Sequence, residues 1–175
     1  MGYIKYKEKK YNLVSIKLSK SSDFNALLKE FHTLFFSGLD KKVEHIRYAI
    51  LELVNNSIRA HKELDRNDPI TISFSMNDNF LTILIKDAGG GFNTSDLPYD
   101  INQDVSDIDM NNSSFQDYRE KHSYKRFGMG LLLTKKTFDS FKITFYGNDG
   151  KECPWEQGVS RGTIIEMRSR IENEQ

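Results

Sequence analysis

Glu52-Leu-Val-Asn-Asn-Ser-Ile-Arg59 is the stretch around which the rest of this sequence is best understood. Glu52 and Asn56 are four residues apart, so on a helix their side chains lie one above the other on a single face. Leu53 and Ser57 belong to the adjoining stripe, which we expect to be buried. The carboxylate and the amide are therefore expected to line the floor of a cleft. A solvated helix face with a chance pair of polar residues is the alternative.

A second segment, Asp87-Ala-Gly-Gly-Gly-Phe92, follows an apolar strand. An ionised carboxylate accepts hydrogen bonds only, so Asp87 is suited to an exocyclic amino group such as that of adenine. Gly89 and Gly91 allow the backbone to approach a ligand closely. A simple Asp-Gly turn is the alternative, although such a turn requires fewer than three consecutive glycines.

The third segment, Phe127-Gly-Met-Gly-Leu131, precedes an apolar run that predicts a helix. Free N–H groups at a helix N-terminus bind anions, and Lys125 and Arg126 add positive charge just before it. A loop-to-helix junction with two solvated basic residues is the alternative. Neither a phosphate loop of the Gly-x-x-x-x-Gly-Lys-Ser/Thr type nor the Rossmann glycine spacing is present. Together, the three segments predict a nucleotide site.

Hydrophobic periodicity predicts a two-layer α/β sandwich, with a mixed and mostly antiparallel sheet and helices on one face. The long helix should bury Val43, Ile46, Ile50, Leu53, Ser57 and Leu64. The expected elements are a strand at 11–18, a helix from Ser21 or Ser22 to Gly38, a helix from Asp40 to about Leu64, a hairpin of 70–76 with 81–85, a helix from about Gly128, and strands at 142–146 and 163–168.

Two stretches do not follow these periods. Residues 93–126 are polar and lie between the two glycine segments, where a lid over a nucleotide would be placed; a disordered insertion is the alternative. Residues 147–161 form an insert that contains Cys153, Pro154 and Trp155.

Composition excludes several classes of function. The chain has 175 residues, and Lys+Arg equals Asp+Glu at 25 each, so no net charge favours nucleic acid or an anionic membrane. A single cysteine precludes an intrachain disulfide and suits a reducing compartment. The sequence has neither an apolar run of membrane-spanning length nor a secretory signal at its start, so we expect a cytoplasmic protein.

In this order and at these element boundaries, the three segments resemble the motifs of the GHKL or Bergerat-fold ATPases. The helix with Glu52 and Asn56 is similar to the N-box, Asp87-x-Gly89-x-Gly91 to the first glycine box, and Gly128-Met129-Gly130-Leu131 to the second. The resemblance covers about 11–168 of a single domain, 1–175.

The resemblance implies ATP and Mg²⁺ as cofactors. It implies that Asn56 holds the metal, that Asp87 recognises adenine, and that the second box folds over the triphosphate with a lid at about 93–127. It also places Arg59 near the phosphates and, in the pair Gly162-Thr163, a threonine that assists adenine binding.

Within this superfamily the N-terminal half resembles the anti-sigma-factor serine/threonine kinases. That resemblance implies a dimer that phosphorylates a STAS-type anti-anti-sigma protein and sequesters a sigma factor, with Glu52 as the base. The insert at 147–161 departs from their short terminal hairpin.

Two alternatives remain. A detached histidine-kinase-like catalytic domain is one, although none of the four histidines is followed by an acidic residue. An ATP-gated protein-binding module with little turnover is the other, with Tyr3, Tyr6 and Trp155 as exposed aromatic residues for its partner.

Overall fold

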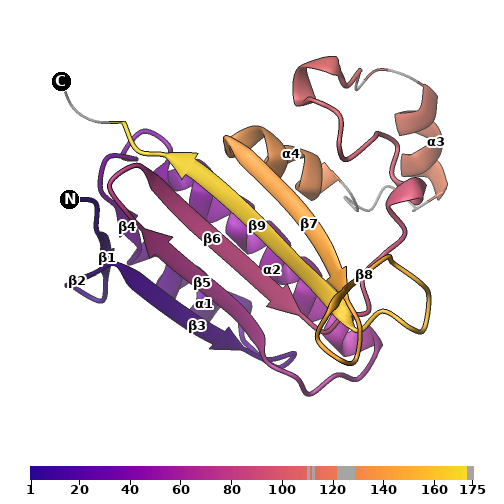
Figure 1. Ribbon diagram of the computed structural model, residues 1–175, viewed down its shortest axis with the longest axis horizontal. Coiled ribbons are helices and arrows are strands. Elements are labelled where there is room, and N and C mark those ends of the chain that lie inside the picture. Colours follow the sequence, from indigo (N-terminus) through magenta and orange to yellow (C-terminus); the bar gives the residue numbers. More distant parts are fainter. Residues whose placement is uncertain (110, 112, 122–128, 173–175) are drawn as a thin grey trace.

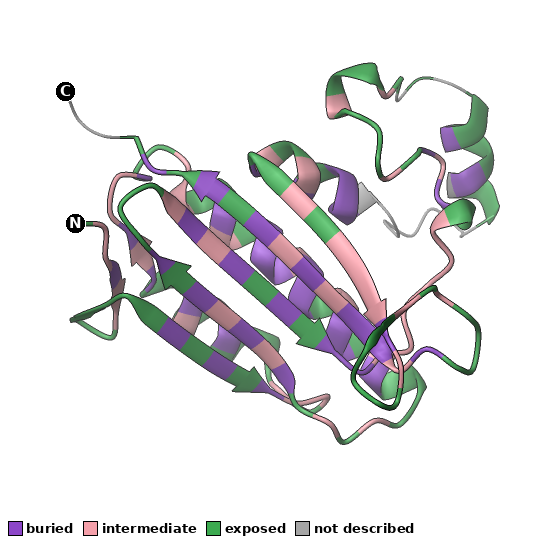
Figure 2. Cartoon of the chain, viewed as in Figure 1, coloured by how far each residue is buried: buried purple, intermediate pink, exposed green. Residues whose placement is uncertain are grey.

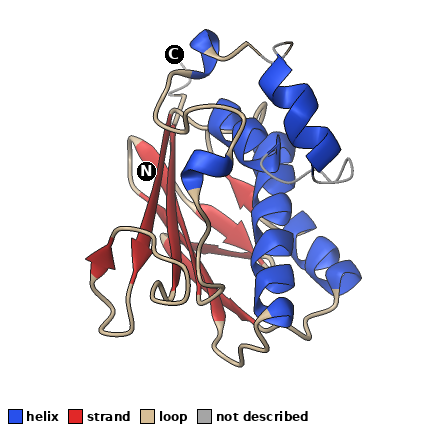
Figure 3. Cartoon of the chain, turned by 90° about the vertical axis from the view of Figure 1, so that its right-hand side faces the viewer, coloured by secondary structure: helices blue, strands red, loops and turns tan. Residues whose placement is uncertain are grey.

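A computed structural model describes residues 1–109, 111, 113–121 and 129–172. A six-stranded sheet carries helices on one face, as Figures 1 and 3 show. Its strand order is β3-β5-β6-β9-β7-β8, and every neighbouring pair among them is antiparallel. The strands are β3 (Leu13–Leu18), β5 (Ile70–Met76), β6 (Phe80–Asp87), β7 (Ser140–Tyr146), β8 (Glu152–Cys153) and β9 (Gly162–Arg170). The predicted two-layer α/β class is confirmed.

The sheet has one buried and one open face because its strands alternate apolar and polar residues. Figure 2 shows this alternation along β5, β6 and β9. Ile72 is paired with Ile85, and Ile85 with Ile165, so apolar side chains form rows across the inner face. Helix α2 (Val43–Glu63) buries Ile46, Ile50 and Leu53 in the same core.

A second, three-stranded sheet was not expected from the sequence. Strands β1 (Ile4–Tyr6), β2 (Lys9–Tyr11) and β4 (Phe35–Phe36) associate in the order β2-β1-β4. Ile4 is opposite Phe36 and both are fully buried, while the Phe36 ring lies 5.8 Å from that of Phe74. Ile4 of the basic start is therefore part of the core opposite Phe36, while β2 is exposed.

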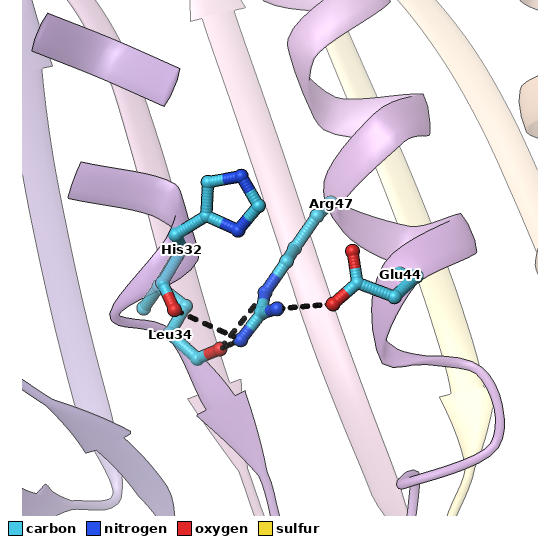
Figure 4. Close-up of polar contacts among 4 residues, drawn as sticks. All are labelled: His32, Leu34, Glu44 and Arg47. Atoms are coloured by element: carbon cyan, nitrogen blue, oxygen red, sulfur yellow. Dashed lines mark hydrogen bonds and ion pairs between the residues drawn. The ribbon is translucent and has the colours of Figure 1, made fainter. Parts of the chain in front are cut away.

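Helix α1 (Phe24–His32) is shorter than predicted. Asp23 rather than a serine is its N-cap, and the helix ends before Gly38 because Phe35 and Phe36 enter β4. Arg47 of α2 stabilises this early end, as Figure 4 shows. Its guanidinium donates to the carbonyls of His32 (3.1 Å) and Leu34, and pairs with Glu44 at 2.5 Å. Carbonyls at a helix end lack partners within the helix, so this contact joins α1 to α2.

The boundaries of α2 also differ from the prediction. Lys42 is the N-cap and makes no side-chain capping bond, so Asp40 is not the cap. Leu64 lies just beyond the helix and is 50% exposed, so it is not part of the buried stripe. None of the helices in the described part of the chain is long and apolar enough to cross a bilayer.

The stretch after the first glycine segment contains short helices over its described residues. It contains two short 3-10 helices, η1 (Thr94–Asp96) and η2 (Val105–Asp107), and helix α3 (Ser113–Lys121). Tyr99 stacks on Phe115 with ring centroids 6.0 Å apart. The apolar residues of this stretch are spread over turns and short helices, so the sequence shows no regular hydrophobic period there. Helix α4 (Met129–Thr137) then returns the chain to α2.

Candidate functional site

A cavity of about 560 Å³ opens between α2, the glycine turn after β6, and the segment that carries η1 and α3. Its volume is typical of sites for small molecules and cofactors. It brings together residues that the sequence analysis selected from the three segments and from the pair Gly162-Thr163. Those that line it are Asn56, Arg59, Asp87, Gly89, Gly91, Leu131 and Thr163.

Asp87 is the last residue of β6 and is held in a fixed orientation inside the cavity. Its side chain accepts a hydrogen bond from Ser57 Oγ at 2.6 Å on one oxygen and from Gly89 N at 2.9 Å on the other. Thr163 is its partner in the β6–β9 ladder and is also buried. Each carboxylate oxygen can accept more than one hydrogen bond. The carboxylate is thus prepared to accept from an amino group of a ligand.

Two further residues make hydrogen bonds to the backbone of the Asp87 turn, and the sequence analysis identified neither. His61 is fully buried and its Nε2 accepts from Ala88 N at 2.8 Å. Tyr146 donates from its hydroxyl to the Asp87 carbonyl at 2.6 Å. Burial lowers the pKa of His61, and the nearby Asp87 carboxylate opposes this only in part. The spacing Ser57 to His61 is one helical turn, which indicates that His61 shares the buried face.

Glu52 and Asn56 form a second polar group where α4 begins. A Cβ atom at position 130 would lie 3.3 Å from Glu52 Oε2 and 4.0 Å from Asn56 Nδ2. Gly130 therefore packs closely against this pair because it has no side chain. Arg59 donates to Asn56 Oδ1 at 3.0 Å. The helix that carries Glu52 and Asn56 thus lies against Gly130 of the second glycine segment.

The remaining predicted site residues are placed only in part. Lys125, Arg126 and Gly128 lie outside the described residues. Met129 is the first residue of α4, but its side chain is not described. Leu131 is buried and lines the cavity, and Thr134 Oγ1 donates to the Gly130 carbonyl at 2.7 Å.

Aromatic residues outside the three segments also line the cavity. Tyr118 of α3 lines the cavity, and burial raises its pKa to about 12, so it stays protonated at neutral pH. Trp155 from the insert lines it as well and is half-buried, whereas the sequence analysis treated it as an exposed residue. Tyr3 and Tyr6 are also only partly exposed, and the Tyr6 hydroxyl donates to Glu30.

These features are typical of a nucleotide-binding domain of the GHKL type: Asp87 lies in the cavity, and Glu52 and Asn56 lie beside Gly130 in the first turn of α4. The histidine kinase-like ATPase domain model matches residues 26–153, which is more than half of the chain. The chain therefore belongs to the histidine kinase-like ATPase domain family. A comparison with curated proteins gives no significant match. Membership of this family indicates ATP binding and ATP-dependent activity.

Proposed function

We propose that this protein is a Mg-ATP-dependent serine/threonine kinase of the anti-sigma-factor type, which phosphorylates a STAS-type anti-anti-sigma partner and also binds a sigma factor. The observation that carries the proposal is the contact of Gly130 with Glu52 and Asn56. It gives the site a carboxylate at the N-terminus of α4, where the phosphates of a nucleotide are expected to bind. Asn56 and Asp87 line the same cavity, whereas Glu52 and Gly130 do not, and we assign recognition of adenine to Asp87.

The residues beside Gly130 fit a magnesium ion that arrives with the nucleotide. Asn56 Oδ1, which accepts from Arg59 at 3.0 Å, has a second lone pair and is a neutral oxygen of the kind that Mg²⁺ accepts, while phosphates and water would supply the other ligands. Among the described residues no cluster of three or more His, Cys, Asp or Glu side chains is placed to hold a metal. When bound, the ion neutralises charge on the phosphates.

Glu52 is the residue that we assign to proton transfer. It is half-buried on α2, its carboxylate faces Gly130, and one helical turn separates it from Asn56. A serine hydroxyl of the partner that enters beside Gly130 can pass its proton to Glu52 Oε2 as its oxygen bonds to the terminal phosphorus of ATP, and the bond from that phosphorus to the bridging oxygen breaks to release ADP. Asn56 and the backbone at the start of α4 orient the phosphates for that attack.

The positions of the histidines favour transfer to a partner protein over self-phosphorylation on histidine. His61 is fully buried beneath the Asp87 turn, where its Nε2 accepts from a backbone amide. His32 ends α1 and His45 lies in the first turn of α2, at the opposite end of that helix from Asn56 and Arg59. His122 lies outside the described residues.

Transfer of radiolabelled phosphate tests the proposal directly. The purified chain is incubated with Mg²⁺, γ-labelled ATP and a STAS-domain protein from the same host. We expect label on a serine or threonine of the STAS protein. Label on a histidine of the chain itself would instead establish the histidine-kinase alternative, and nucleotide binding without transfer would establish the binding module.

Asp87→Asn is the control for this assay because its amide presents a donor where adenine also presents one. We expect it to lose labelling through loss of ATP affinity. Asp78→Asn, in an exposed turn outside the cavity, should label as wild type. Equal labelling by both variants would show that the cavity around Asp87 is not the nucleotide site.

A further inference from the structure

We propose that Trp155 forms the base-side wall of the nucleotide site and contacts the nucleoside through its ring. This inference rests on the proposed nucleotide function and adds a contact that the three glycine and N-box segments do not provide. Trp155 belongs to the connection between β8 and β9, and it lines the same cavity as Asp87 and Thr163.

The position of Trp155 follows from its contact with the first glycine segment. Gly91 has φ +70°, and a Cβ atom there would lie 2.9 Å from Trp155 Cδ1 and 2.7 Å from Phe145 Cδ1. The indole and the Phe145 ring thus pack directly on the backbone of Gly91, which needs both a glycine conformation and the absence of a side chain. Gly91, Asp87 and Trp155 all line the cavity, so we place the indole at the end of the cavity where Asp87 would bind the base.

The connection that carries Trp155 is firmly held on both sides. Glu156 N donates to Ser160 Oγ at 2.8 Å, and Ser160 N donates to the Glu156 carbonyl at 3.0 Å. Gly90 N donates to the Arg161 carbonyl at 3.0 Å, while Arg161 pairs with Asp68 at 2.6 Å. The wall is therefore formed before a ligand arrives, and binding does not have to order it.

The indole presents its carbon surface to a ligand. Trp155 Nε1 is closed off from solvent and has no acceptor among the residues that the structure describes. The side chain as a whole is nevertheless only half-buried and lines the cavity. An aromatic surface of this kind stacks on the π-face of a base, whatever the base carries at its edges. Asp87 then supplies the selectivity, and Trp155 supplies affinity.

Calorimetry on the full chain tests this contact with ATP and ADP in the presence of Mg²⁺, and with adenosine. We expect Trp155→Ala to weaken all three by about tenfold, because a lost base contact affects each equally. Trp155→Phe keeps an aromatic surface and should stay within about threefold of wild type. Val159→Ala is the matched control, since Val159 lies in the same connection, is 53% exposed and does not line the cavity.

Wild-type affinity of Trp155→Ala for adenosine would overturn the inference while leaving the nucleotide function standing. A loss confined to ATP would overturn it too, because it would place Trp155 at the phosphates. If wild type binds no adenine ligand, the proposed function fails as well. If Trp155→Ala does not fold, the fluorescence emission of Trp155 in the wild-type chain, its single tryptophan, is measured instead. Adenosine must change that emission in wild type, and unchanged emission would overturn the contact.

Discussion

Ser57 Oγ donates a 2.6 Å hydrogen bond to Asp87 Oδ2, and this buried contact joins the middle of α2 to the end of β6. The two residues are 30 positions apart in sequence. The contact fixes the orientation of the carboxylate toward the cavity, since the other oxygen is held by Gly89 N.

Ser57→Ala should destabilise the fold by about 1.5–3 kcal/mol, the usual contribution of a hydrogen bond to a charged group. It should also lower ATP affinity, because Asp87 loses one of its two orienting donors. Urea unfolding and calorimetry measure the two effects. Ser15→Ala, on an exposed position of β3, is the control and should change neither. Unchanged ATP affinity in Ser57→Ala would mean that Asp87 is not the base contact.

Asn56→Ala should weaken Mg-ATP binding by about 100-fold while the fold is kept, because the phosphate end loses its neutral oxygen ligand. When a chelator removes the magnesium, the ATP affinity of Asn56→Ala should differ little from that of wild type. Asn55→Ala, on the neighbouring exposed position of α2, provides the control. If the dependence of ATP affinity on magnesium is the same in both variants, Asn56 does not hold the metal.

Glu52→Gln should bind Mg-ATP as wild type does but lose phosphoryl transfer by about 100-fold or more, as expected for removal of a general base. The amide keeps the shape beside Gly130, so the glycine contact is preserved. Initial rates of label transfer to the partner measure the effect. Glu152→Gln, at an exposed position of β8 outside the cavity, should retain its rate. Full turnover by Glu52→Gln would exclude Glu52 as the base.

Stability should fall as the pH drops below about 6.5 because of His61. Its pKa is lowered in the folded chain by burial, so below the unfolded value of about 6.5 the unfolded chain takes up a proton that the folded chain excludes. The contribution of His61 to the free energy of unfolding is therefore fully present above that pH. Below it, the free energy of unfolding decreases by at most about 1.4 kcal/mol per pH unit. Urea unfolding between about pH 7 and 5 measures this slope.

Two variants assign that slope to one residue. His61→Gln should lose most of the decrease between about pH 6.5 and 5, whereas His45→Gln at an exposed position should retain it. The carboxyls of Asp65 and Asp68 do not interfere, because Lys20 and Arg161 lower their pKa below the usual 3.8. The same slope in His61→Gln as in wild type would contradict the assignment.

Protease cleavage within residues 93–121 should slow when Mg-ATP is added. Tyr118 of α3 and Leu97 line the cavity, so a ligand there adds contacts to this segment and reduces its opening. Mass spectrometry of the fragments locates and times each cut. Asp87→Asn, which we expect not to bind, should be cut at equal rates with and without ATP. Equal rates in wild type would contradict a lid.

The sequence by itself determined the local features of this protein. Alternating residues predicted β5, β6 and β9, and the period of α2 placed Glu52 and Asn56 on one face. The positions of Asp87 at a strand end and Gly130 at a helix start also followed from neighbouring residues. These properties depend on backbone geometry over a few positions, so short windows of sequence contain them.

Only the tertiary structure decided which of these features meet. That β1 joins β4, that His61 and Tyr146 support the Asp87 turn, and that Trp155 reaches Gly91 all depend on contacts between distant segments. No local pattern identifies such partners, since a buried histidine or tryptophan is equally suited to many cores. Packing selects the partner only when the sheet and α2 are assembled, because the space beside each side chain is then defined.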